Sequence, residues 1–219
     1  MSRTEDRESL QDLGRASIQI VHDLKNQLNG LKLYATFLRR RIEKSERPDD
    51  EQETIGKLIN GLDRAAHDLS MIVELGREVE LKIQPGFEMA KVLRNLCSSF
   101  KENEAQVVCE SNADAIQGDF DHSKLTDAFK SMFAGAIKFK KNEDGAQPVK
   151  VSVKASDNNA VIEWSGLRPL NHDPFRTFAG SDEIRLSLAK KIIEAHGGST
   201  ELADQKLVVV LPLAGSQPG

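Results

Sequence analysis

The sequence predicts a two-domain α+β protein in which a helical hairpin precedes an α/β sandwich. Up to about residue 80, apolar residues recur at alternating spacings of three and four, which is the period of paired helices. Beyond that point, helical stripes alternate with short runs of valine and isoleucine, which favour strands. The change falls near Pro85. We therefore expect domains at 1–82 and 83–219.

Two heptad seams define the hairpin. Between them, the polar stretch 44–50 contains Pro48 and predicts a turn. Because two helices cannot enclose a core, the remaining apolar surface predicts a homodimer in which two hairpins form a four-helix bundle. The first seam contains Val21, Leu24, Leu28, Leu31, Ala35, Leu38 and Ile42, and the second contains Ile55, Leu58, Leu62, Ala65, Leu69, Ile72, Gly76 and Val79.

The second domain alternates element types. Apolar stripes predict three helices, at 89–100, 121–139 and 184–196. Alternating valines predict a strand hairpin at 149–153 and 161–164. Two further strands are expected, a short one at 107–109 and a buried one at 207–211, and the tail from residue 214 is expected to be disordered.

The bulk composition excludes several function classes. With a net charge of -4 over 219 residues, the chain has no general electrostatic affinity for nucleic acid or an anionic membrane. No apolar run approaches the ~20 residues that cross a bilayer, and the N-terminus lacks a signal-peptide core. Cys97 and Cys109 form no closely spaced pair, so neither a disulfide nor a metal framework is expected. These features predict a cytoplasmic protein.

One polar face of the first helix carries groups suited to phosphoryl chemistry. The heptad register places His22 off the seam, with Asp23 and Lys25 beside it and Asn26 and Asn29 on the same face. A neutral imidazole is a nucleophile, and a carboxylate can fix its tautomer. An amide can hold a water, and a lysine can offset phosphoryl charge. Spacing alone leaves open that this histidine is an ordinary surface residue.

The stretch Ile20-Val21-His22-Asp23-Leu24-Lys25-Asn26-Gln27-Leu28 resembles the H-box of sensor histidine kinases. In that family a histidine followed by an acid, with Thr or Asn four positions after the histidine, opens the dimerisation hairpin. The resemblance implies His22 as the phosphoacceptor, Asp23 as its polarising acid and Asn26 as a residue that positions water for phosphatase activity.

The second domain looks like the ATPase domain of the same family. The segment Lys190 to Gly198 and the closing strand Leu207 to Leu213 carry the clearest likeness. Phe129 to Phe139 is similar to the N-box helix, and Pro174 to Phe178 is similar to the F-box. With the hairpin, the resemblance spans residues 10 to 213.

The sequence departs from the family where ATP would be held. Gly135 replaces the N-box asparagine that helps bind Mg²⁺. Trp164 stands in the place of the aspartate that accepts the adenine amino group, and an indole can only donate. The second glycine box reads Ser181-Asp182-Glu183-Ile184-Arg185-Leu186, without its glycines. We therefore expect no ATP or Mg²⁺ as cofactor, and Trp164 as a packing residue in the vacated adenine pocket.

An intact phosphoacceptor beside a lost nucleotide site is the arrangement of dimeric histidine phosphotransferases that look like degenerate histidine kinases. The resemblance implies transfer between His22 and the aspartates of response-regulator receiver domains, with Mg²⁺ supplied by the receiver. Two alternatives remain: an active but atypical sensor histidine kinase, and a scaffold that binds a receiver without chemistry.

The same helix face predicts where a receiver docks. Leu33 and Phe37 lie off the seam, four residues apart, and continue the face of His22, Asn26 and Asn29 toward the hairpin turn. Apolar residues on an exposed face often mark a contact site. We expect Asn29, Leu33 and Phe37 to bind the partner.

Overall fold

The computed structural model divides the chain into two compact units, Met1–Glu78 and Val79–Gly219, and each is considered by itself. The predicted boundary after residue 82 falls slightly later along the chain. No described helix is long and apolar enough to cross a membrane. The structure describes residues 21, 24–40, 42, 49–102, 107–111, 116–140, 148–170, 173–175 and 181–213.

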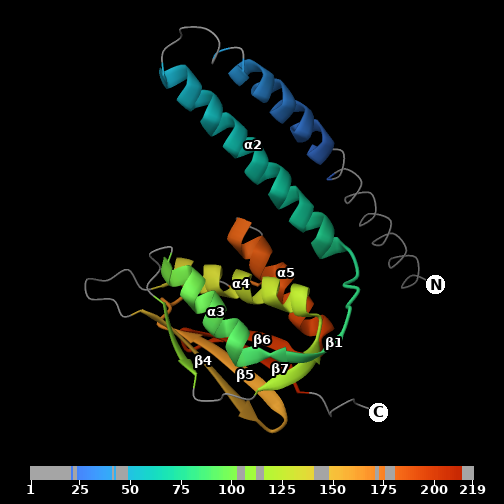
Figure 1. The fold of residues 1–219 in the computed structure, drawn as a ribbon, viewed down its shortest axis with the longest axis vertical. Helices are drawn as coiled ribbons and strands as arrows, with labels where there is room; N and C mark the ends of the chain where they lie inside the picture. Colours follow the sequence, from blue (N-terminus) through green and yellow to red (C-terminus); the bar gives the residue numbers. More distant parts are fainter. Residues whose placement is uncertain are drawn as a thin grey trace, which may run out of the picture. The chain divides into compact units, whose positions relative to one another are not determined.

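The first unit is a helical hairpin. Its first helix is described at residues 21, 24–40 and 42, and its second is α2 (Asp49–Gly76). An ion pair between Lys32 and Asp63 joins the two helices, and Ile42 lies beside Ile55 around a shallow hollow near the turn. These pairings require antiparallel helices, as Figure 1 shows. Most of the predicted turn at 44–50 lies outside the described residues.

The second unit contains three helices and seven strands among its described residues. In chain order they are β1 (Gln84–Glu88), α3 (Met89–Glu102), β2 (Val107–Ser111), β3 (Gln117–Phe120), α4 (His122–Lys138), β4 (Val149–Ser156), β5 (Asn159–Ser165), α5 (Ser181–Ala195), β6 (Ser199–Ala203) and β7 (Lys206–Pro212). The predicted mixed α+β class is confirmed.

Five strands form the main sheet, in the order β2-β4-β5-β7-β6. Every neighbouring pair is antiparallel except β2 with β4, which is parallel. The register aligns inward side chains across three strands: Trp164 of β5 lies opposite Val151 of β4 and Leu207 of β7. On the other face Glu163 accepts hydrogen bonds from Lys154 and Lys206. One face is therefore apolar and the other carries charge, as in a sheet covered on one side.

Helices α3, α4 and α5 lie over the apolar face of this sheet (Figure 1). Strand alternation supplies one side of the core and the helical stripe of α4 supplies the other. Asp121 caps α4, since its Oδ1 accepts a hydrogen bond from the N–H of Lys124 at 3.0 Å. α5 ends at Ala195, and Gly197 in the turn that follows has a φ of 77°, the left-handed conformation that glycine adopts after helix ends.

Three short strands were missed by the sequence analysis: β1, β3 and β6. Two of them, β1 and β3, form a separate two-stranded antiparallel sheet with an irregular register between Gln84 and Phe87. These segments contain glycine, proline and charged residues, so they lack the valine-rich alternation that identified β4 and β5. The expected buried strand is β7, but only alternate residues are buried in it. The predicted disordered tail lies beyond the described residues.

The close contact after α5 predicts a strict requirement for glycine. A Cβ added at Gly198 would overlap the carbonyl oxygen of Val210 and would lie 2.9 Å from side-chain atoms of Ile193 and Leu211. A backbone oxygen cannot move aside as easily as the end of a flexible side chain. Gly198→Ala is therefore expected to lower the free energy of unfolding by roughly 1–3 kcal/mol.

Urea titration followed by the fluorescence of Trp164, the only tryptophan in the chain, measures this loss. Ser199→Ala is the control, because that neighbouring side chain is exposed and its removal should change the stability by less than about 0.5 kcal/mol. Equal stability of the two variants would contradict the packing at Gly198.

Candidate functional site

The predicted phosphoacceptor face is only partly visible. His22 and Asp23 lie outside the described residues. Of the other predicted residues on this face, Asn26 and Asn29 are exposed on the first helix and Lys25 is half-buried. The described part of the face is therefore polar and accessible to solvent at Asn26 and Asn29.

Farther along the first helix, the predicted docking residues are exposed. The side chains of Leu33 and Phe37 are both 55% exposed. Tyr34 is 68% exposed and was not singled out from the sequence, because its heptad position flanks the seam. The spacing of Tyr34 and Phe37, three positions apart on the helix, would have indicated that they share a face. These three residues form what we call the docking patch.

The apolar seam of the first helix is covered on one side only. Ala35 is buried, and Leu28 and Ile42 are half-buried. By contrast Leu24, Leu31 and Leu38, which recur every seven residues, remain about half exposed within the single chain. A stripe of leucines in water is unfavourable by roughly 25 cal/mol for each Å² of apolar surface left unburied.

In the second unit, α4 and α5 meet at Gly135. This glycine is buried, and a Cβ added to it would lie 2.8 Å and 2.9 Å from the two methyl groups of Leu186. Leu186 is itself fully buried. By the resemblance to histidine kinases, Gly135 stands at the position of the N-box asparagine, and Leu186 belongs to the segment that corresponds to the second glycine box. The side chain of Leu186 therefore occupies the space that a longer residue at position 135 would need.

An ion-pair cluster lies at the same junction. The Lys138 ammonium lies 2.8 Å from Asp182 Oδ2 and 3.7 Å from Glu183 Oε1. The hydrogen bond to Asp182 raises the pKa of Lys138. Both carboxylates stand in the first turn of α5, where the helix dipole favours negative charge. The sequence showed the two acids but not their partner, because Lys138 comes from a different helix.

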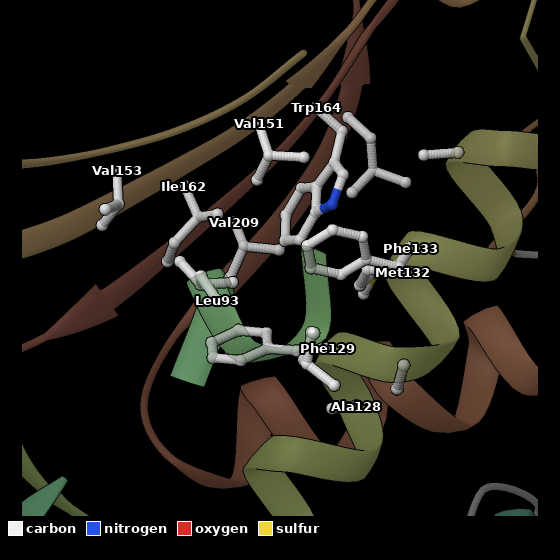
Figure 2. Packing of buried hydrophobic residues seen from close by; sticks show 14 of the residues in the cluster. Leu93, Ala128, Phe129, Met132, Phe133, Val151, Val153, Ile162, Trp164 and Val209 are labelled. Atoms are coloured by element: carbon white, nitrogen blue, oxygen red, sulfur yellow. The ribbon is translucent and has the colours of Figure 1, made fainter. Parts of the chain in front are cut away.

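Trp164 lies in the core between the sheet and α4. Its side chain is fully buried, with ring centroids 5.6 Å from Phe133 in an edge arrangement and 6.3 Å from Phe129. Figure 2 shows the indole pointing from the strand toward these two rings. The prediction that Trp164 is a packing residue is confirmed. Its Nε1 is buried without a hydrogen-bond partner among the described residues.

No protein-family model matches the chain. Among curated proteins, the chain is 23% identical over 212 residues to the sensor histidine kinase ZraS of Escherichia coli strain K12. This match covers 91% of the chain but only 44% of ZraS, so the chain spans less than half the length of that protein.

Solved structures that include named histidine kinases share the fold at low identity. The Acinetobacter baumannii histidine kinase AdeS matches with a TM-score of 0.59 at 15% identity, covering 87% of this chain and 97% of that one. Full-length ShkA, in complex with AMPPNP, gives 0.70 at 16%, covering 91% and 46%. ThkA, in complex with the response regulator TrrA, gives 0.62 at 19%, covering 95% and 64%. The chain therefore has the fold of the sensor histidine kinase catalytic core.

Proposed function

We propose that the chain is a histidine phosphotransfer protein of two-component signalling, which carries a phosphoryl group on His22 between receiver-domain aspartates. The contact between Gly135 and Leu186 is the observation that carries this choice over an ATP-dependent kinase. In a chain with this fold, a phosphoacceptor that cannot draw on ATP still has a use, because a phosphorylated receiver is an alternative donor.

The residues present do not fit a nucleotide held as the family resemblance implies. Gly135 offers no side-chain oxygen for Mg²⁺, and Leu186 fills the adjoining space. Trp164 is packed among phenylalanine rings and has no acceptor for an adenine amino group. Asp182 and Glu183 would repel a triphosphate, and both already face Lys138. We therefore assign no ATP to this unit.

The proposed reaction is an in-line exchange between two proteins. A neutral imidazole nitrogen of His22 attacks the phosphorus of a receiver's aspartyl phosphate. An N–P bond forms as the P–O bond to the aspartate breaks, and the receiver recovers its carboxylate. Transfer to a second receiver reverses these steps, and the receiver supplies the Mg²⁺ that shields the phosphoryl charge.

The neighbours of His22 have separate roles in this scheme. Asp23 accepts a hydrogen bond from the other ring nitrogen and stabilises the positive charge that develops on the imidazole. Lys25 offsets negative charge on the phosphoryl oxygens. Asn26 holds a water for hydrolysis when the phosphoryl group is lost rather than passed on. Asn29 and the docking patch bind the receiver, in line with the response regulator bound by ThkA.

The exposed leucine stripe supports a homodimer. Leu24, Leu31 and Leu38 repeat with the seven-residue period of a coiled-coil seam, and a second copy offers an identical stripe. Two hairpins would then form a four-helix bundle that buries these side chains and leaves the docking patch in water.

A transfer assay tests the proposed reaction. We expect label to reach the protein from a phosphorylated receiver but not from labelled ATP, and His22→Ala to abolish the transfer. Phe37→Asp should slow transfer at least tenfold, because it places a charge in a contact worth about 1.4 kcal/mol or more. Ile83→Asp is the matched control, since Ile83 is 52% exposed but lies outside the hairpin.

Each alternative predicts a different result of this assay. Label arriving from ATP on His22 would mean an active kinase. Binding of the receiver, with no label reaching the protein from either ATP or the phosphorylated receiver, would mean a scaffold. Equal transfer rates for Phe37→Asp and the wild type would remove the docking patch from the proposal while leaving the reaction intact.

Two leucines of similar exposure allow the dimer seam and the docking patch to be tested independently. Leu31 and Leu33 are almost equally exposed, at 54% and 55%. Leu31→Asp is expected to give a monomer in sedimentation at micromolar concentration, because it puts a carboxylate in the seam. Leu33→Asp should remain dimeric. If the wild type is a monomer, or if both variants remain dimeric, the leucine stripe is not a dimer interface.

A double-mutant cycle tests the closed contact between α4 and α5. Leu186→Ala alone is expected to cost roughly 2–5 kcal/mol of unfolding free energy, and Gly135→Asn alone roughly 1–3 kcal/mol. In the Leu186→Ala background, the loss of unfolding free energy caused by Gly135→Asn should be smaller than in the wild type by about 0.5–3 kcal/mol, because Leu186 no longer fills the space that the asparagine needs. Urea titrations of the four proteins measure the coupling. Strict additivity would mean that the two positions do not compete for space.

A further inference from the structure

A chain of hydrogen bonds ties the segment that enters the second unit to two of its helices. The backbone N–H of Lys82, just before β1, donates to Asp121 Oδ2 at 2.9 Å. The backbone N–H of Asp121 donates to His196 Nε2 at 3.0 Å. The other ring nitrogen, Nδ1, lies 2.7 Å from the carbonyl oxygen of Ile192 in α5. A segment near residue 82 thus depends on a histidine more than a hundred residues later.

These partners fix the protonation state of the imidazole. Nε2 receives a backbone N–H, so it must be the acceptor and carries no proton. Nδ1 faces a carbonyl oxygen, so it must be the donor. The ring is therefore neutral, with its proton on Nδ1. An imidazolium has two donors and no acceptor, so protonated His196 cannot keep its bond from Asp121.

Burial is the largest influence on the ring, and it also favours the neutral form. His196 is buried, with the neutral ring of Phe120 from β3 at a centroid distance of 5.7 Å. Burial lowers the pKa of His196. Among described residues, two charged groups influence the ring, and both come from the start of α4. The Asp121 carboxylate attracts a proton and the Lys124 ammonium repels it.

The Asp121 carboxylate accepts two backbone hydrogen bonds, one with each oxygen. Its Oδ1 caps α4 through the N–H of Lys124, and its Oδ2 holds the N–H of Lys82. The hydrogen bond from Lys124 holds the pKa of Asp121 below its ordinary value, although burial opposes the shift. Asp121 therefore stays ionised throughout the range in which a histidine titrates. An imidazolium beside it would compete with both backbone donors for the carboxylate.

We propose that Lys82, Asp121 and His196 form an acid-sensitive latch on the segment joining the hairpin to the second unit. Proton uptake on Nε2 of His196 breaks the bond from the Asp121 N–H and draws the Asp121 carboxylate away from Lys82. The entering segment and the first turn of α4 then loosen together. This inference does not depend on the proposed phosphotransfer.

The sign of the pH dependence follows from linkage. A histidine with a lowered pKa in the folded state contributes stability that is present above about pH 6.5, its ordinary pKa. That contribution is lost as the pH falls from there through the pKa of the folded state. The latch is therefore closed at neutral pH and opens on mild acidification, above the range where Asp121 takes up a proton.

Amide hydrogen exchange of the full chain between pH 7.5 and 5.0 tests the latch. Protection factors, corrected for the intrinsic pH dependence of exchange, are compared at Lys82 and Asp121. In the wild type we expect protection at both amides to fall with pH, by up to about tenfold for each unit below about pH 6.5, until the pKa of His196 in the folded state is reached. Ile193 in the middle of the core provides an internal reference that should keep its protection.

Two variants separate the latch from a general acid effect. His196→Gln cannot titrate, but its side-chain oxygen can accept the Asp121 N–H, so protection at Lys82 should stay constant with pH. His67→Gln, which removes an exposed histidine of α2, should behave as the wild type. Matching pH profiles for His196→Gln and the wild type would overturn the proposal.

A measurement on the wild type keeps the test independent of how the variants fold. Nitrogen chemical shifts of the His196 ring are expected to show the Nδ1-protonated tautomer at pH 7.5. Its titration midpoint should coincide with the loss of protection at Lys82. A ring that titrates while Lys82 stays protected would rule the latch out.

Discussion

The packing of α4 against the sheet and α5 is the constraint on which the second unit depends. Trp164 and the phenylalanine rings of α4 fill the space over the central strands, and Leu186 closes the gap against Gly135. A core gains stability by excluding voids, so each of these large side chains removes space that a bound molecule would otherwise need. The same packing makes this unit compact without a ligand, and the proposal that it holds no nucleotide depends on it.

The hairpin, in contrast, leaves many of its apolar side chains exposed. Half of its heptad stripe is covered within the chain, while a second set of leucines and a group of aromatic side chains remain exposed. Soluble proteins rarely leave such surfaces without a use. The proposed dimer seam and the proposed receiver contact use these two surfaces separately.

Much of this could be predicted from the sequence, because the strongest signals are periodic. Heptad spacing identified the hairpin, apolar helical stripes identified α3, α4 and α5, and two-residue alternation identified the pair of β4 with β5. The departures at Gly135 and Trp164 were also visible, because a residue type alone decides whether a metal or adenine contact can be made. Whether their neighbours fill the resulting space could not be predicted, since Leu186 reaches Gly135 only through the tertiary fold.

The remaining features depend on contacts between distant residues. Lys138 meets Asp182, and His196 meets Asp121, across intervals that no local pattern links. The short strands β1, β3 and β6 owe their existence to pairing partners rather than to their own composition. Phosphoacceptor assignment at His22 and Asp23 stays a prediction, because those two residues lie outside the described part of the chain.

The position of β7 in the sheet bears on the order in which the protein can form. This strand is the last of those described along the chain, yet it lies between β5 and β6. During synthesis the hairpin is made before the second unit and needs only local contacts, which form quickly. The main sheet cannot close until β7 has been made. A newly made chain therefore completes its leucine stripe while the main sheet still lacks one of its inner strands.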